Sequence, residues 1–361
     1  MGRVGAEGAK TPGAISRITS APEGNPRDTQ DMRTPVSDPM KIGPYRIVGR
    51  LGSGGMGWVY LGRSPAGREV AVKVVRPELA AEGEFRQRFA REVAAARVVS
   101  GAYTAAVIDA DTEAELPWLA TMYVPGPSLA EAVRTDGPLP EPQVRRLGAG
   151  LVEALQAIHA ARVVHRDLKP ANVLLASDGP RVIDFGISRV DGAPGLTQAG
   201  IVVGTPPFMS PEQIKGAPVG PPSDVFSLGG VLVYALTGRP PHGSGEAVRY
   251  RVVLAEPELG DVPRGMRDLI AHCLAKRPED RPQLGELLAE LLEQTPKTPS
   301  ELWPPPAVAH SIKVRTRDLA NRRKDGPSVS VPSCLLLHAQ ALLDAGLTDA
   351  MVAEAVGRGD A

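Results

Sequence analysis

The sequence predicts an α+β protein of two lobes: a small N-terminal lobe of antiparallel β-strands with one helix, and a larger, mainly helical C-terminal lobe. Three observations predict this fold. Short runs rich in β-branched and aromatic residues, separated by glycines, fill residues 45–75. Apolar residues then recur at helical spacing over 84–99, and from residue 144 onward the long periodic stretches are mostly helical. With 361 residues, the chain has the length for two such lobes.

The N-terminal lobe is expected over about residues 41–124. Its strands are the short β-rich runs, with glycines between the first three of them. A helix over 84–99 follows the third strand, because Phe85, Phe89 and Val93 recur on one helical face. The predicted strands are 45–48, 58–61, 70–75, 106–109 and 117–124.

The C-terminal lobe is expected over about residues 125–295. Apolar residues repeat there at helical spacing in long stretches, which predicts helices that bury one face. The longest apolar run, Val225–Thr237, is about 13 residues long and therefore too short to span a bilayer, which takes roughly 20. The predicted helices are 144–160, 223–236, 264–275 and 284–292.

Three flanking segments differ in composition from the two lobes. Residues 1–40 are rich in Gly, Pro, Ser, Thr and Arg and have almost no large apolar side chains, so we expect a disordered arm. Residues 296–332 are proline-rich and then basic and are expected to form a linker, which the five prolines of 295–306 predict to be extended there. Residues 333–361 are amphipathic and predict a helical tail. Dimerisation or docking would use this tail or the N-terminal arm.

Composition excludes several classes of function. Lys plus Arg and Asp plus Glu each total 41, so no net charge attracts the chain to nucleic acid. Residues 347–357 resemble the first helix of a helix-turn-helix, but no recognition helix follows, and we expect no nucleic-acid partner. The only cysteines, Cys273 and Cys334, exclude a disulfide framework and a cysteine zinc site. Without a signal peptide or a membrane span in the sequence, the expected location is cytoplasmic.

The first chemical motif is the glycine-rich run Gly52-Ser53-Gly54-Gly55-Met56-Gly57. Glycines at these places let backbone amides approach phosphate oxygens. The run alone is weak evidence for nucleotide binding. A dinucleotide-binding turn should open a helix, whereas strand-like residues follow, and a Walker A loop needs Lys and then Ser or Thr after the last glycine.

Lys73 lies among apolar neighbours in the third predicted strand. Taken singly, a strand lysine that extends its ammonium into water is the simpler interpretation. Glu92, however, lies on the helix predicted next and could face Lys73. An ion pair between them would hold the ammonium on the α- and β-phosphates of a nucleotide.

Two further motifs follow in the C-terminal lobe, His165-Arg166-Asp167-Leu168-Lys169-Pro170-Ala171-Asn172 and then Asp184-Phe185-Gly186. Together with the glycine run and Lys73, they resemble the motifs of eukaryotic-type (Hanks-type) protein kinases, and most closely those of the bacterial Ser/Thr kinases. The resemblance covers residues 44–294. It implies a bilobed protein-kinase fold, ATP and Mg²⁺ as cofactors with Mn²⁺ as an alternative metal, and protein substrates that accept phosphate on Ser or Thr.

The resemblance implies a role for each motif residue. Asp167 orients or deprotonates the acceptor hydroxyl, and Lys169 steadies the γ-phosphate. Asn172 and Asp184 are the implied metal ligands, and their oxygens suit Mg²⁺. The implied catalytic residues are Lys73, Glu92, Asp167, Lys169 and Thr205.

The walls of the ATP site are implied in the same way. Adenine would bind backbone groups of a hinge around 121–124, where Thr121 occupies the gatekeeper position. A small gatekeeper predicts an accessible back pocket. The implied nucleotide-binding residues are Leu51, Gly52, Ser53, Gly54, Gly55, Met56, Gly57, Val59, Ala71, Lys73, Thr121, Tyr123, Val124 and Leu174.

The activation segment supplies further expectations from the same resemblance. Thr205 matches the threonine that contacts the catalytic aspartate in Ser/Thr kinases, and Thr197 is the candidate phosphate acceptor. Glu212 is expected to pair with Arg281, and Asp224 to hold the backbone of the catalytic loop. The alternative to an active kinase is a pseudokinase or scaffold that acts through its tails, because a fold can outlive its activity.

Overall fold

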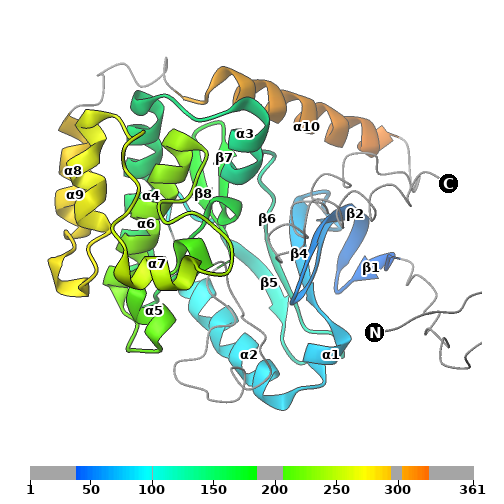
Figure 1. Cartoon of the computed structure of the whole chain (residues 1–361). Helices are drawn as coiled ribbons and strands as arrows, with labels where there is room; N and C mark the ends of the chain where they lie inside the picture. Colours follow the sequence, from blue (N-terminus) through cyan, green and yellow to red (C-terminus); the bar gives the residue numbers. More distant parts are fainter. Residues whose placement is uncertain (1–37, 100, 185–205, 294–302, 325–361) are drawn as a thin grey trace, which may run out of the picture. The chain divides into compact units, whose positions relative to one another are not determined.

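The computed structural model describes residues 38–99, 101–184, 206–293 and 303–324, which Figure 1 draws as coloured ribbons. The predicted arm up to residue 37, the predicted tail 333–361, and both Thr197 and Thr205 lie outside the described residues. Within the described ranges, no helix is long and apolar enough to cross a membrane.

A six-stranded antiparallel sheet forms the N-terminal lobe, in the order β1-β2-β3-β4-β6-β5. In β4, Val70, Val72 and Val74 are buried on one face, while Ala71 and Lys73 lie on the other, as the alternation of a strand requires. Lys73 therefore points away from the buried valines. The strands are β1 (Lys41–Ile42), β2 (Tyr45–Gly54), β3 (Gly57–Arg63), β4 (Glu69–Val75), β5 (Val107–Asp111) and β6 (Trp118–Met122).

Two helices connect β4 to β5, the short α1 (Pro77–Ala80) and α2 (Gly83–Val98). The apolar stripe of α2 packs on the sheet, because Phe85, Phe89 and Val93 share one buried cluster with Val75 of β4 and Leu119 of β6. This packing fixes α2 beside the strand that carries Lys73.

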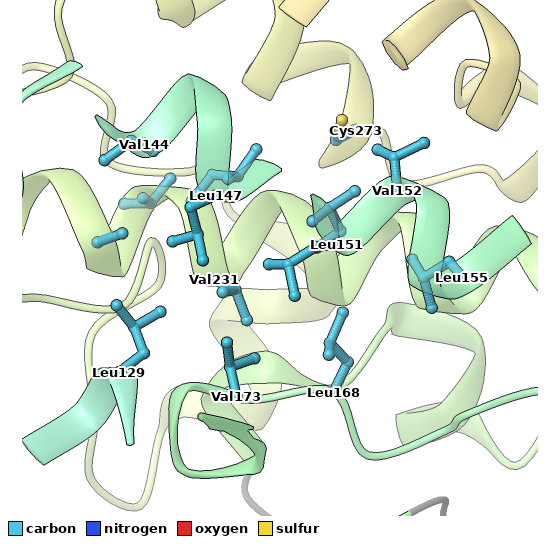
Figure 2. Packing of buried hydrophobic residues seen from close by; sticks show 14 of the residues in the cluster. Leu129, Val144, Leu147, Leu151, Val152, Leu155, Leu168, Val173, Val231 and Cys273 are labelled. Atoms are coloured by element: carbon cyan, nitrogen blue, oxygen red, sulfur yellow. The ribbon is translucent and has the colours of Figure 1, made fainter. Parts of the chain in front are cut away.

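The helices of the C-terminal lobe surround one large apolar core (Figure 2). Leu147, Leu151 and Leu155 of α4 lie at its centre and are fully buried, with Val231 of α6 and Cys273 of α8 packed around them. Such burial stabilises each leucine by roughly 1.5–3 kcal/mol. The helices are α3 (Leu129–Asp136), α4 (Glu141–Ala160), α5 (Pro211–Lys215), α6 (Pro221–Thr237), α7 (Val248–Leu254), α8 (Arg264–Cys273) and α9 (Leu284–Glu293).

A two-stranded hairpin, β7 (Val173–Ala176) and β8 (Gly179–Val182), leads from the motif that ends at Asn172 to Asp184, with which the next motif begins. A one-turn 3₁₀ helix, Pro170–Asn172, leads directly into β7. Val173 pairs with Val182, so the residues that precede β7 and those that follow β8 lie next to each other.

The structure confirms the predicted strands and the four long helices, with boundaries that differ by a few residues. Strand β2 runs to Gly54 rather than ending at residue 48, because it pairs with β3 through the glycine-rich run. No pattern in the sequence predicted α3, α7 or the β7–β8 hairpin. These elements are short, and few periodic positions distinguish them from loops.

The prediction of a linker over 296–332 is wrong for its central part. Residues Pro306–Lys324 form a helix, α10. Its apolar residues are sparse within a basic run, yet Val308 and Leu319 are buried against the rest of the protein. Tertiary contacts, not helical propensity or hydrophobic periodicity, therefore stabilise this helix.

Candidate active site

A cavity of about 300 Å³ lies between the N-terminal sheet and the first elements of the C-terminal lobe. Leu51, Val59 and Ala71 of the sheet line it from one lobe, and Leu174 of β7 lines it from the other. Apolar walls of this kind suit a flat aromatic base. The predicted nucleotide-binding residues that line the cavity are Leu51, Gly52, Ser53, Val59, Ala71, Lys73, Thr121, Tyr123, Val124 and Leu174.

The second half of the glycine-rich run does not line this cavity. Gly54 pairs with Gly57, and the two residues between them form the tip of the β2–β3 hairpin. A Cβ atom on Gly57 would lie 1.8 Å from the carbonyl oxygen of Val74, so only glycine lets β3 approach β4 there. Gly54, Gly55, Met56 and Gly57 are thus not among the residues that line this cavity, and nucleotide binding by them stays a prediction.

Lys73 forms an ion pair with Asp184, with its Nζ atom 3.0 Å from Oδ1 of the carboxylate. Both residues line the cavity. Burial alone would raise the pKa of Asp184, but the Lys73 ammonium, with smaller contributions from Lys169 and His165, holds it below its usual value. Asp184 is therefore an anion near neutral pH, as a metal ligand must be.

Lys73 and Glu92 are both among the described residues, but they do not form the predicted ion pair. The Oε2 atom of Glu92 is buried without a hydrogen-bond partner there. Burial raises the pKa of Glu92 to about 8, even though the charge of Lys73 acts in the opposite direction. The ammonium of Lys73 contacts Asp184 instead, which leaves the Glu92 carboxylate unpaired.

Asp167 is held by two neighbours of the same motif. Nδ2 of Asn172 donates to the backbone carbonyl of Asp167 at 2.9 Å and to its Oδ2 atom at 3.1 Å. Nζ of Lys169 lies 3.2 Å from the same Oδ2 atom. These contacts fix the orientation of the carboxylate and place a cation beside it.

The register of the β7–β8 hairpin brings the predicted metal ligands, Asn172 and Asp184, next to each other. Because Val173 pairs with Val182, Asn172 precedes the pair and Asp184 lies two residues beyond it. The backbone N–H of Ile183 donates to the carbonyl of Asn172 at 3.0 Å, which ties the two ends together. An amide oxygen and an ionised carboxylate are a donor set that fits Mg²⁺.

The backbone of the predicted catalytic loop is held by Asp224, which lies in the first turn of α6. The N–H of His165 donates to Oδ2 of Asp224 at 2.9 Å, and the N–H of Arg166 donates to Oδ1 at 2.8 Å. Arg166 has φ of 64°, a left-handed conformation that costs a non-glycine residue about 1–3 kcal/mol. The fully buried Asp224 carboxylate stabilises this turn and thereby positions Asp167.

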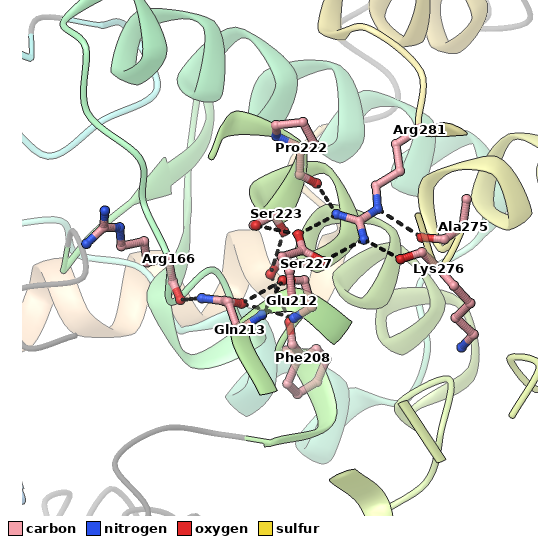
Figure 3. Close-up of polar contacts among 11 residues, drawn as sticks. Arg166, Phe208, Glu212, Gln213, Pro222, Ser223, Ser227, Ala275, Lys276 and Arg281 are labelled. Carbon is pink, nitrogen blue, oxygen red and sulfur yellow. Dashed lines mark hydrogen bonds and ion pairs between the residues drawn. The ribbon is translucent and has the colours of Figure 1, made fainter. Parts of the chain in front are cut away.

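Glu212 and Arg281 form the predicted buried ion pair, and Figure 3 shows its surroundings. The guanidinium donates to both carboxylate oxygens at 2.7 and 2.8 Å, and also to three backbone carbonyls. Burial opposes ionisation of Glu212, but the hydrogen bond from Arg281 lowers its pKa below the usual value. The adjacent Gln213 donates to the carbonyl of Arg166 at 2.8 Å, so this anchor also reaches the catalytic loop.

Several residues that line the cavity were not among the predicted site residues. Met122 and Ile183 adjoin predicted residues, so their positions in the motifs could have indicated them. The others come together only in the fold, and except for Ala171, which precedes Asn172 in its motif, the sequence carries no local signal for them. They are Ala96, Ala105, Val107, Leu119, Gly126, Ser128, Glu131, Ala171 and Arg315.

Comparisons with known proteins agree with this geometry. The protein kinase domain family matches residues 45–292. The chain is 54% identical over 278 residues to the probable serine/threonine-protein kinase PkwA of Thermomonospora curvata, covering 76% of this chain and 37% of the relative. It is 55% identical over 257 residues to the serine/threonine-protein kinase AfsK of Streptomyces coelicolor, covering 70% and 32%.

Among solved structures, the crystal structure of the Mycobacterium tuberculosis PknI kinase domain is similar, with a TM-score of 0.58 and 28% identity over 71% of this chain and 97% of that one. The chain spans about a third of the length of the curated relatives it matches. The cavity, the Lys73–Asp184 pair and the held Asp167 occupy the region that the family covers. The chain therefore belongs to the protein kinase family.

Proposed function

We propose that this chain is a serine/threonine protein kinase that transfers the γ-phosphoryl group of ATP to Ser or Thr hydroxyls of proteins, its own included. The observation that carries the proposal is the Lys73–Asp184 pair, 3.0 Å long, which joins the two lobes at the cavity. A cation for the phosphates and an anion for a metal thus lie side by side. The similarity to proteins named serine/threonine-protein kinases supports the choice of acceptor.

The residues of the catalytic loop have separate roles in this proposal. Asp167 accepts the proton of the substrate hydroxyl on its carboxylate, which Asn172 and Lys169 hold in place. Lys169 steadies the γ-phosphate, and Lys73 holds the α- and β-phosphates. Positioning and electrostatic stabilisation are the main contributions that phosphoryl transfer needs from a protein.

Asp184 and Asn172 would hold the divalent metal, Mg²⁺ or in its place Mn²⁺. A bound metal would neutralise charge that develops on the transferred phosphoryl group. Thr205 would contact Asp167 and complete the catalytic set, whereas Glu92 does not pair with Lys73 in this structure.

The first test is phosphosite mapping by mass spectrometry after incubation with ATP and Mg²⁺. We expect phosphoserine and phosphothreonine, with Thr197 among the sites, and at least about a hundredfold less incorporation in Asp167→Asn. Asp261→Asn is the matched control, because that aspartate is 67% exposed and lies in the loop before α8. Equal incorporation by wild type and Asp167→Asn would contradict the proposal, and phosphate on tyrosine alone would contradict the acceptor class. A pseudokinase would incorporate no phosphate in any variant.

Protein substrates and ATP are the proposed partners, with dimerisation or docking through the segments 1–40 and 333–361 and no role for nucleic acid. The proposed location is the cytoplasm, where a reducing environment would keep Cys273, a free and buried cysteine, as a thiol. Fractionation of cells that express the full chain tests the location.

A further inference from the structure

The helix α10 lies outside the part of the chain that the kinase family matches, yet it is packed on the catalytic lobe (Figure 1). The residue Trp303, just before it, is 6% exposed, and its indole Nε1 donates to the carbonyl of Ala176 in β7 at 2.8 Å. Val308 is 1% exposed and belongs to the large core of the C-terminal lobe. These contacts hold the N-terminal half of α10 in place.

One face of α10 continues this packing. Val308, Ile312, Arg315 and Leu319 follow each other at intervals of four, three and four residues, so they lie on one side of the helix. Ile312 packs against the large core, and Leu319 is buried. The single charged residue of this face is Arg315, whereas Arg317 is exposed.

Arg315 forms an ion pair with Glu131 of α3. Its side chain is 29% exposed and that of Glu131 is 25% exposed, so the pair is largely shielded from water. The Nε atom of Arg315 lies 3.4 Å from Oγ of Ser311, a long contact within its own helix. A guanidinium has five N–H donors, so this pairing leaves donors for a ligand.

Arg315 and Glu131 both line the nucleotide cavity, next to Gly126 and Ser128, which follow the hinge. Lys73 and Arg315 are the two basic side chains among the described residues that line it, and Lys73 is held by Asp184. The phosphates would lie at the Lys73–Asp184 pair and the base between the apolar walls. The part of a nucleotide left for the Arg315–Glu131 pair is the ribose.

We propose that Arg315 is a nucleotide-binding residue, supplied by a helix beyond the catalytic domain, and that with Glu131 it binds the ribose hydroxyls. The carboxylate of Glu131 accepts a hydrogen bond from one hydroxyl, and the guanidinium donates to a hydroxyl oxygen. This inference rests on the proposed function, because it requires that a nucleotide occupies the cavity.

The proposal couples the docking of α10 to nucleotide binding. A nucleotide that contacts Arg315 binds more tightly when α10 is docked, and by reciprocity it stabilises the docked helix. Release of α10, for example by a partner that binds its buried face, would then weaken nucleotide binding.

The test measures the affinity of the full-length chain for ADP by isothermal titration calorimetry. We expect Arg315→Ala to bind ADP about tenfold more weakly, as for the loss of one charge-assisted hydrogen bond. Arg317→Ala is the matched control, because it removes the same side chain from an exposed position two residues away on the same helix, and it should bind ADP as wild type does. Circular dichroism and thermal unfolding check that each variant is folded.

A second titration assigns the contact to the sugar. The loss caused by Arg315→Ala should shrink severalfold when 2′,3′-dideoxy-ADP replaces ADP, because the hydroxyls that Arg315 contacts are then missing. Hydrogen exchange should in addition show that ADP slows exchange in residues 306–321 of wild type and not of Arg315→Ala.

Three outcomes would overturn the inference: equal ADP affinity in wild type and Arg315→Ala, tighter binding by Arg315→Ala, or an equal loss for ADP and its dideoxy analogue. Tighter binding would mean that α10 obstructs the cavity. Failure of the proposed function looks different, since the chain would then bind ADP with the predicted dependence on Arg315 but transfer no phosphate.

Discussion

The ammonium of Lys73 lies 3.0 Å from the carboxylate of Asp184, and the two residues come from opposite lobes. Lys73 is carried by a central strand of the sheet, and Asp184 follows the β7–β8 hairpin. The pair therefore brings the charge that would bind phosphate and the charge that would bind metal to one place in the cavity. Lys73 does not pair with Glu92 in this structure.

Replacement of Lys73 by methionine keeps the length of the side chain and removes its charge. We expect the rate of phosphoryl transfer at saturating ATP to fall by about a hundredfold or more, because one preorganised charge is lost. Lys41→Met is the control, since Lys41 is an exposed lysine of the same lobe. The rates are measured with labelled ATP and a generic basic protein substrate, and an unchanged rate in Lys73→Met would refute the assigned role.

The buried Glu92 carboxylate predicts a specific dependence of stability on pH. Burial raises its pKa from 4.5 to about 8, so between these values the folded protein holds a proton that the unfolded chain has released. The free energy of unfolding contributed by this group therefore falls as pH rises through that window, by at most about 1.4 kcal/mol per pH unit.

Glu92→Gln should remove this part of the slope, because an amide does not titrate. Without nucleotide, the variant should be more stable than wild type at pH 8.5 and closer to it at pH 5, as urea unfolding at both values would show. Glu84→Gln, on the exposed side of the same helix, should leave the slope unchanged. Identical slopes for wild type and Glu92→Gln would contradict the assignment.

The Glu212–Arg281 pair predicts a large loss of stability on truncation of one partner. Arg281→Met leaves the Glu212 carboxylate without its cationic partner and three backbone carbonyls without the guanidinium that donates to them, in a buried site. We expect the free energy of unfolding to fall by about 3–5 kcal/mol in chemical denaturation. Arg277→Met removes the arginine of an exposed pair with Glu279 and should change stability little. Similar losses in the two variants would show that burial does not determine the effect.

Small and apolar residues line the cavity around Thr121, the predicted gatekeeper. This lining predicts that the protein binds ATP-competitive inhibitors with bulky groups. Thr121 lines the cavity together with Ala96, Ala105, Val107 and Leu119. Thr121→Met should therefore weaken ATP-competitive inhibitors with bulky back-pocket groups by about tenfold or more, because the longer side chain fills that space. Inhibitors without such groups serve as the comparison in a competition assay. Equal affinity of a bulky inhibitor for both proteins would mean that Thr121 is not the gatekeeper.

The sequence predicted those parts of the fold that local patterns encode. The β-rich run 70–75 predicted the strand β4 that carries Lys73, and the stripe of α2 predicted its packing face. The motif residues Asp167 and Asn172 were identified by their types and order, and the structure brings them into contact. These predictions succeeded because each depends on neighbours close in the chain.

The remaining features depend on contacts between distant residues, which no local pattern encodes. Lys73 pairs with Asp184 and not with Glu92, and the sequence does not indicate which of the two carboxylates lies closer to the ammonium. Helix α10 was missed because its stabilising contacts lie far away in the chain, with 127 positions between Trp303 and Ala176 and 184 between Arg315 and Glu131.

The β7–β8 hairpin has a consequence for how this protein tolerates changes in length. Its open end presents Asn172 and Asp184, while Ala176 at its closed end accepts the indole hydrogen bond of Trp303. A substitution or insertion at the turn, Ser177–Asp178, that keeps Val173 opposite Val182 would spare the first pair of residues and disturb the second contact. A slip of one position along the strands would instead reverse the facing of every side chain in the hairpin. A change in strand register would thus affect the predicted metal ligands, whereas a change in the turn would affect the contact that attaches the C-terminal segment.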